Sequence, residues 1–269
     1  MGITEYSELG FSNNFMFGKL MENPERCKRF LEQILGLRIQ NIKYVEKEKT
    51  LEEKYDGRGI RLDIYVDDGK TIYNCEMQTS NIGNLPKRSR YYQSKIDINS
   101  LKKGEDYNLL KKSYVIFICT FDPYGKNQYI YTFENMCREE TGVFLGDETI
   151  KIFINTKGSV GDISEEYKEL LRFIDSSQDR YYNNKLANDL LSDLKKARSN
   201  EEWRHDYMTW VDYGNECRAE GRAEGRAEGR AYDVEAMLRK GRTPEEIADF
   251  CGYELSYVKE VQKKLLVEA

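Results

Sequence analysis

The sequence has 269 residues, of which 33% are charged and 39% hydrophobic, and its formal net charge is −5. This composition is typical of a soluble protein with one large domain, or one domain and a small appendage. No run approaches the ~18 consecutive apolar residues of a membrane span, and no secretory signal opens the chain. We therefore expect a cytoplasmic protein with no membrane partner. The acidic balance argues against a surface coated in positive charge, but it leaves a local basic groove open.

Histidine and cysteine chemistry is limited. His205 is the only histidine, which removes multi-histidine zinc sites and argues against a Ser-His-Asp triad. The six cysteines form no Cys-x-x-Cys pair, so we expect reduced thiols in the core. Hydrolysis by carboxylates and a metal ion requires no histidine, so the composition is compatible with it.

The first 60 residues predict two helices and a strand. Apolar residues at helical spacing predict a helix that ends near residue 22, and Asn23 with Pro24 begins a second helix that Gly36 ends. Glu32 on the second helix is either an extra catalytic acid or an ordinary exposed glutamate. A strand is expected over residues 39–47 and a loop over 54–59. Between them, residues 46–53 are either a charged connection or an extension of the strand.

Residues 61–78 predict a β-hairpin, because two alternating strands flank an Asp-Gly pair. If Asp68 and Gly69 are the two loop residues, Asp63 lies opposite Asn74. A slip of one residue would move Asp63 to the other face.

In this register Asp63, Glu76 and Gln78 project from one face of the hairpin. Glu76 is then the diagonal neighbour of Asp63, with roughly 7–8 Å between their backbones. Two carboxylates at that separation can together bind a hard cation such as Mg²⁺. A structural hairpin with a solvated polar face is the alternative.

A predicted helix over residues 87–98 follows, with Lys87, Arg88 and Arg90 in its first turn. Cations there oppose the helix dipole, so either an anion binds nearby or this end is solvated. Further strands are expected over residues 113–121, 128–134 and 149–155, and helices over 164–176 and 184–197. This order predicts an α/β fold, a mixed β-sheet flanked by helices that ends near residue 200.

The remaining residues predict a helical extension. Residues 201–230 read as one long helix that ends in three Arg-Ala-Glu-Gly repeats, which either pair with a second copy or form a flexible linker. Thr243-Pro-Glu-Glu is a capping box in a helix-turn-helix-like unit, which serves either DNA contact or packing. We predict three segments: a domain over 1–200, a long helix over 201–232, and a small helical unit over 233–269.

A series of motifs resembles a known family. In order they are NNFMFGK (13–19), IRLDIYV (60–66), EMQ (76–78), LPKRSRYYQS (85–94) and KGEDY (103–107). The series is similar to the recombination-promoting nuclease and transposase family of bacteria, an E-x-Q variant of the PD-(D/E)XK nuclease superfamily. The resemblance implies a restriction-endonuclease-like sheet and Mg²⁺- or Mn²⁺-dependent cleavage of DNA.

The resemblance also implies roles for particular residues. Asp63 and Glu76 are the expected metal ligands, and Gln78 stands where the superfamily has a lysine that orients or activates water. Asn14 stands where the family often has an aspartate. Lys87, Arg88 and Arg90 are expected to contact DNA phosphates. The uncharged Gln78 and Asn14 also fit a second hypothesis, a catalytically degenerate nuclease fold that binds DNA or protein.

Overall fold

The computed structural model describes residues 5–39, 42, 44–51 and 60–267. The chain divides into two compact units, residues 1–203 and 204–269, and each is considered by itself. The predicted loop over 54–59, and the end of the charged connection that precedes it, lie outside the described residues. Among the helices that are described, none has the length and apolarity needed to cross a membrane.

The first unit is built on a mixed sheet, which has six strands within the described residues. The strands are β1 (Tyr44–Leu51), β2 (Ile60–Asp67), β3 (Thr71–Gln78), β4 (Lys112–Cys119), β5 (Ile130–Phe133) and β6 (Thr149–Asn155). Their order across the sheet is β1-β2-β3-β4-β6-β5. β3, β4 and β6 run parallel, and the other neighbours are antiparallel. The predicted α/β fold is confirmed, and the arrangement is that of a restriction-endonuclease-like domain.

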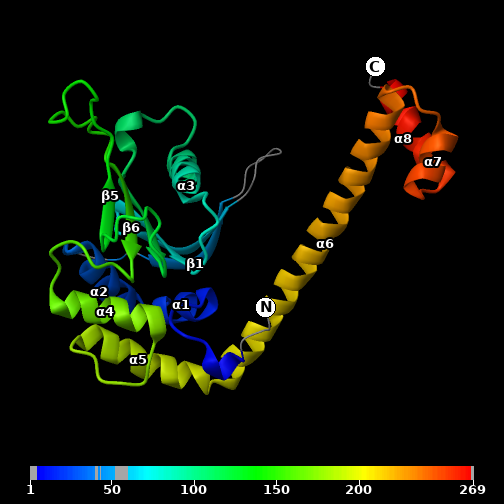
Figure 1. Cartoon of the computed structure of the whole chain (residues 1–269). Helices are drawn as coiled ribbons and strands as arrows, with labels where there is room; N and C mark the ends of the chain where they lie inside the picture. The colour runs from blue at the N-terminus through cyan, green and yellow to red at the C-terminus, as the bar shows by residue number, and fades with distance from the viewer. Residues whose placement is uncertain (1–4, 40–41, 43, 52–59, 268–269) are drawn as a thin grey trace. The chain divides into compact units, whose positions relative to one another are not determined.

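Helices cover the sheet on both faces (Figure 1). They are α1 (Asn14–Met21), α2 (Pro24–Leu35), α3 (Leu85–Ser100), α4 (Glu165–Ser176) and α5 (Lys185–Arg198), with short 3₁₀ turns at Tyr6–Glu8 and Tyr107–Leu109. α1, α2, α4 and α5 pack together on one side, and α3 lies on the other. The predicted cap of α2 is confirmed, since Asn23 accepts hydrogen bonds from the backbone of Glu25 and Arg26.

The central strand β4 is buried along almost its whole length, as its continuous apolar run predicts. Beneath α3 its side chains join one apolar cluster. That cluster consists of Leu62, Tyr65, Ile72, Leu85, Tyr92, Ile96, Val115, Phe117, Cys119 and Phe153. Phe117 stacks on Phe153 with ring centroids 5.4 Å apart. This packing fixes α3 against β3 and β4, the strands that carry the predicted site.

The hairpin register differs from the prediction by two residues. Asp67 pairs with Ile72, and Asp68 N–H donates to the Thr71 carbonyl at 3.1 Å, so the turn is centred on Gly69 and Lys70 instead of Asp68 and Gly69. The Asp68 carboxylate accepts hydrogen bonds from the backbone N–H groups of Lys70 and Thr71, at 2.9 and 2.7 Å, and these stabilise the shifted turn. Because the side-chain period of a strand is two, this shift leaves every side chain on its predicted face.

The first strand also differs. β1 begins at Tyr44, several residues later than expected, and takes up the first part of the charged connection predicted over residues 46–53. It pairs antiparallel with β2 from Tyr44↔Asp67 to Leu51↔Ile60. Pairing with a neighbouring strand therefore outweighs the low β-propensity of a segment rich in lysine and glutamate.

The second unit is helical. α6 (Glu201–Arg239) continues without interruption past residue 232, where the long helix was predicted to end. α7 (Pro244–Cys251) and α8 (Leu255–Val267) follow, and the predicted capping box at Thr243 is confirmed. Val234, Ile247, Val258 and Val261 form a small core among these helices. The predicted division into three segments remains a prediction.

Candidate functional site

Asp63 and Glu76 meet where β2 and β3 separate. The backbone pairing of the two strands ends at Ile64↔Cys75. Beyond it, Asp63 N–H donates to Glu76 Oε1 at 3.1 Å, and Met77 N–H donates to Asp63 Oδ2 at 3.0 Å. Each carboxylate thus accepts from the backbone of the opposite strand. These crossed hydrogen bonds bring the two predicted metal ligands directly across from each other.

Glu76 is a buried acid, with only 2% of the residue exposed. Burial raises its pKa well above the ordinary value, and the neighbouring Asp63 carboxylate raises it further. Hydrogen bonds from Asp63 N–H and from the Asn74 amide, together with the Arg88 charge, oppose that rise. With its NH₂ group assigned toward them, Asn74 donates to Glu76 Oε1 at 3.1 Å and to the Ile64 carbonyl at 3.3 Å. The net result disfavours two negative charges in this position.

Arg88 extends from the first turns of α3 into the site. Its Nη1 donates to Gln78 Oε1 at 2.9 Å, and its Nη2 donates to the Tyr92 hydroxyl at 3.0 Å. Nη2 also lies 3.5 Å from Glu76 Oε2. The guanidinium packs over the rings of Tyr92 and Phe117, at 5.2 and 5.4 Å from their centroids. Its position is therefore fixed by hydrogen bonds, charge and aromatic packing together.

Gln78 is held at the end of β3. Its Nε2 donates to the Met77 carbonyl at 2.8 Å, while its Oε1 accepts from Arg88. The uncharged amide thus sits beside a guanidinium. Positive charge at this point comes from α3 and not from the third residue of the E-x-Q motif.

The other predicted residues have different surroundings. Lys87 and Arg90 are exposed on α3, whereas Arg88 between them is half-buried. Asn14 is exposed at the first residue of α1. Glu32 accepts a hydrogen bond from Ile39 N–H at 2.8 Å, so its carboxylate stabilises the end of α2.

Sequence reasoning missed two members of the site. Asn74 and Tyr92 both contact it, one from β3 and one from α3. Tyr92 lies four residues after Arg88, a spacing that places both on one helix face, and this signal was available in the sequence. Asn74 shares a strand face with Glu76 and Gln78 by the same alternation that selected them.

The donors present suit a hard divalent cation. Asp63 and Glu76 offer only oxygen atoms. Burial first and the Asp63 carboxylate second raise the pKa of Glu76, and a bound cation would offset both by stabilising the ionised carboxylate. Among the described residues, no group of three or more His, Cys, Asp or Glu side chains could hold a metal. A metal at this position would rely on two carboxylates, with water or substrate oxygens as further ligands.

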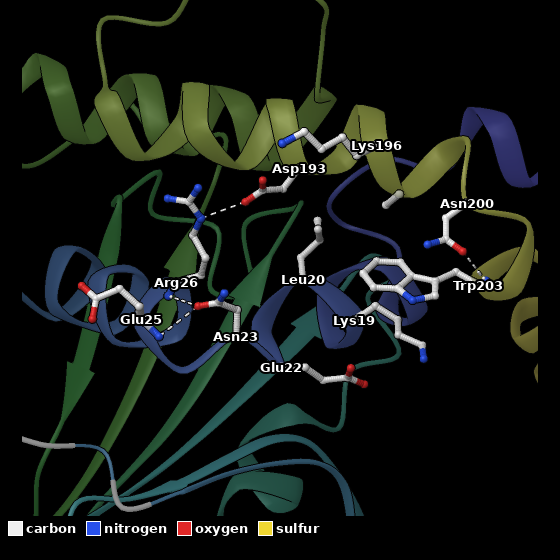
Figure 2. Close-up of a pocket in the computed structure, with 11 residues that line it drawn as sticks. Lys19, Leu20, Glu22, Asn23, Glu25, Arg26, Asp193, Lys196, Asn200 and Trp203 are labelled. Atoms are coloured by element: carbon white, nitrogen blue, oxygen red, sulfur yellow. Dashed lines mark hydrogen bonds and ion pairs between the residues drawn. The ribbon is translucent and has the colours of Figure 1, made fainter.

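A cavity of about 760 Å³ lies in the first unit away from the carboxylates, between α1, α2 and the end of α5 (Figure 2). Its wall includes Lys19, Arg26, Asp193 and Trp203. Arg26 Nε donates to Asp193 Oδ2 at 2.8 Å, and the Lys19 ammonium lies 5.4 Å from the Trp203 ring centroid. None of the catalytic, metal-binding or DNA-contacting residues predicted from the sequence is among the residues that line this cavity.

A family model covers most of the first unit. The model of the PD-(D/E)XK nuclease family transposases matches residues 10–209, which include β2, β3 and α3. Neither the curated proteins nor the solved structures contain a match to the chain. Nucleases of the PD-(D/E)XK type generally use divalent metal ions, consistent with the paired carboxylates. The chain belongs to the PD-(D/E)XK nuclease family transposases.

Proposed function

We propose that the protein is a metal-dependent DNA endonuclease with Asp63 and Glu76 as the ligands of Mg²⁺ or Mn²⁺. The crossed hydrogen bonds carry the proposal: Asp63 N–H donates to Glu76 and Met77 N–H donates to Asp63, which holds two carboxylates together at a cost in burial and charge repulsion. A structural role alone does not require a buried acid beside a second one. Carboxyl groups with a strongly perturbed pKa are common at functional sites.

A bound divalent cation would acidify the attacking water and neutralise charge on the scissile phosphate. The chain's own residues then position the reactants. Arg88 fixes the Gln78 amide, which can orient a water molecule by hydrogen bonding. Lys87 and Arg90, exposed on the same helix, would contact the flanking phosphates and set the register of the DNA.

Plasmid nicking in Mg²⁺ or Mn²⁺ tests the proposal. Asp63→Asn and Glu76→Gln should remove cleavage while the protein stays folded. Asp97→Asn is the matched control, since this partly buried carboxylate on α3 bonds to Gln93 and not to the site. Equal cleavage by wild type and both site variants would overturn the assignment.

A second candidate function is a catalytically degenerate nuclease fold that binds DNA or protein. Two observations favour it. The third residue of the E-x-Q motif is the uncharged Gln78, and the Arg88 guanidinium already lies beside Glu76. Calorimetry separates the candidates. Binding of Mn²⁺ that is lost in Glu76→Gln supports the endonuclease, whereas no binding at millimolar Mn²⁺ supports the degenerate fold.

The wider setting is part of the same proposal. A DNA substrate implies action in the bacterial cytoplasm, in recombination or transposition. We also propose that residues 201–232 mediate homo-oligomerisation, and that the chain comprises a nuclease-like domain over 1–200, this helix, and a small helical unit over 233–269.

A further inference from the structure

The repeat segment of α6 contacts the rest of its own chain, among the described residues, chiefly at its last residue, where the Arg230 guanidinium lies 5.7 Å from the Tyr257 ring centroid. Every residue from 218 to 230 is exposed. A Cβ atom added at Gly221, Gly225 or Gly229 would meet no described atom within 4 Å. Each glycine inside a helix costs roughly 1 kcal/mol relative to alanine, so this composition does not favour a solitary solvated helix.

The charges of the segment also lack partners within the helix. The four-residue period aligns arginine with arginine and glutamate with glutamate, which is mildly unfavourable. Unlike charges lie two residues apart, and so point about 200° away from each other. Among the described ion pairs, none involves these arginines or glutamates. Arg218 and Arg226 bond instead to the Asn215 side chain and the Arg222 carbonyl.

Three Glu-Gly-Arg triplets give the helix a self-complementary face. A row of glycines (221, 225 and 229) is flanked on one side by the glutamates (220, 224 and 228) and on the other by the arginines (222, 226 and 230). Each flank lies about 100° from the glycine row. Cys217 continues the glycine row one turn earlier, and it is exposed. The absence of Cβ atoms along the row permits close approach of another helix.

We propose that this face binds the same face of a second copy of the chain, with the two helices parallel. In a parallel two-fold pair, the glutamate flank of one helix lies beside the arginine flank of the other, as for the flanking positions of a parallel coiled coil. An antiparallel pair would bring like charges together on both sides. Charge complementarity therefore selects both the partner and the orientation.

The length of the array fits such a contact. A row with a period of four residues turns by about 40° per repeat around a helix of 3.6 residues per turn. Three glycines thus span about 80° and stay on one side, whereas a longer array would turn away from the partner. The contact narrows the proposed oligomerisation segment to residues 217–230. Each assembly would carry two Asp63–Glu76 sites.

Sedimentation of the full chain tests the pairing. Wild type should sediment at twice 31.6 kDa at micromolar concentration. Glu220→Arg/Glu224→Arg/Glu228→Arg and Arg222→Glu/Arg226→Glu/Arg230→Glu should each weaken self-association at least about 100-fold, since about 0.5 kcal/mol or more is lost at each of several cross-chain pairs. Mixing the two variants should restore a heterodimer, which shows that both remain folded. A monomeric wild type, or variants that self-associate as it does, would overturn the proposal.

Cross-linking at Cys217 tests the orientation. In a parallel pair the two Cys217 side chains face each other, so a short bis-maleimide should link the copies, and Cys217→Ser should abolish the link. In an antiparallel pair they would be separated by about 20 Å, the length of 13 helical residues. A dimer that does not cross-link would refute the parallel arrangement. Neither result depends on nuclease activity, which is measured separately.

Discussion

Arg88→Met should destabilise the first unit far more than a surface change on the same helix. The variant loses two hydrogen bonds from a charged donor, to Gln78 Oε1 and to the Tyr92 hydroxyl, and the ion pair with the buried Glu76. Each such hydrogen bond contributes ~1.5–3 kcal/mol. Because a quarter of the Arg88 side chain is exposed, solvent screens part of this, and we expect a loss of about 3 kcal/mol.

Thermal unfolding in a chelating buffer measures this loss. For a unit of this size, about 3 kcal/mol corresponds to a fall in Tm of roughly 6–12 °C. Methionine retains an apolar stem against Tyr92 and Phe117, so the polar contacts account for most of the change. Arg90→Met is the matched control, since Arg90 is exposed on α3, and it should change stability by no more than about 0.5 kcal/mol.

The loss should also depend on pH. Arg88 is one of the groups that oppose the raised pKa of Glu76, so its removal raises that pKa further. Because the ion pair requires the ionised form of Glu76, and the ionised fraction falls as the pH is lowered, the stability lost in Arg88→Met should be smaller at pH 5 than at pH 8. A loss equal to that of Arg90→Met, or one of the same size at pH 5 and pH 8, would refute this reasoning.

Two further predictions concern the same residues. Glu76→Gln should stabilise the metal-free protein at pH 8, because burial and Asp63 raise the pKa of Glu76 and its ionised form opposes folding. The gain in stability should vanish as the pH falls toward 4.5, and an unchanged or lower Tm of the variant at pH 8 would contradict this prediction. Gln78→Lys places a second cation beside Arg88 and should cost roughly 1–3 kcal/mol, so Arg88→Gln should cost less stability in the Gln78→Lys chain than in wild type. Urea titrations that find no coupling between these two changes would contradict the second.

Local patterns predicted most of the fold. The caps at Asn23 and Thr243 and the continuous apolar run of β4 depend on short-range interactions, and the structure confirms them. β3 is a strand as predicted, but Ile72 to Met77 are buried on both of its faces. β1 could not be placed accurately, because its pairing with β2 outweighs the preferences of a charged segment. The predicted position of the hairpin turn was wrong, because the Asp68 carboxylate accepts backbone hydrogen bonds that stabilise a turn one residue further along the chain.

The predicted site residues fall into two groups. Asp63, Glu76 and Gln78 come together because strand alternation is robust to a shift of two residues. The inward position of Arg88, unlike those of Lys87 and Arg90, depends on how α3 packs on β4, which a linear pattern of three cations does not reveal. The contacts of Asn74 arise from the separation of β2 and β3, and this is a property of the assembled sheet.

The central claim is that Asp63 and Glu76 together hold a metal ion that cuts DNA. Its most direct test is the rate of plasmid nicking in Mn²⁺ for wild type and for Asp63→Asn, with folding checked by thermal unfolding. Metal catalysis supplies several kcal/mol, so we expect cleavage by wild type and a rate at least about 100-fold lower in the variant. Metal-dependent cleavage that persists undiminished in Asp63→Asn would contradict the account.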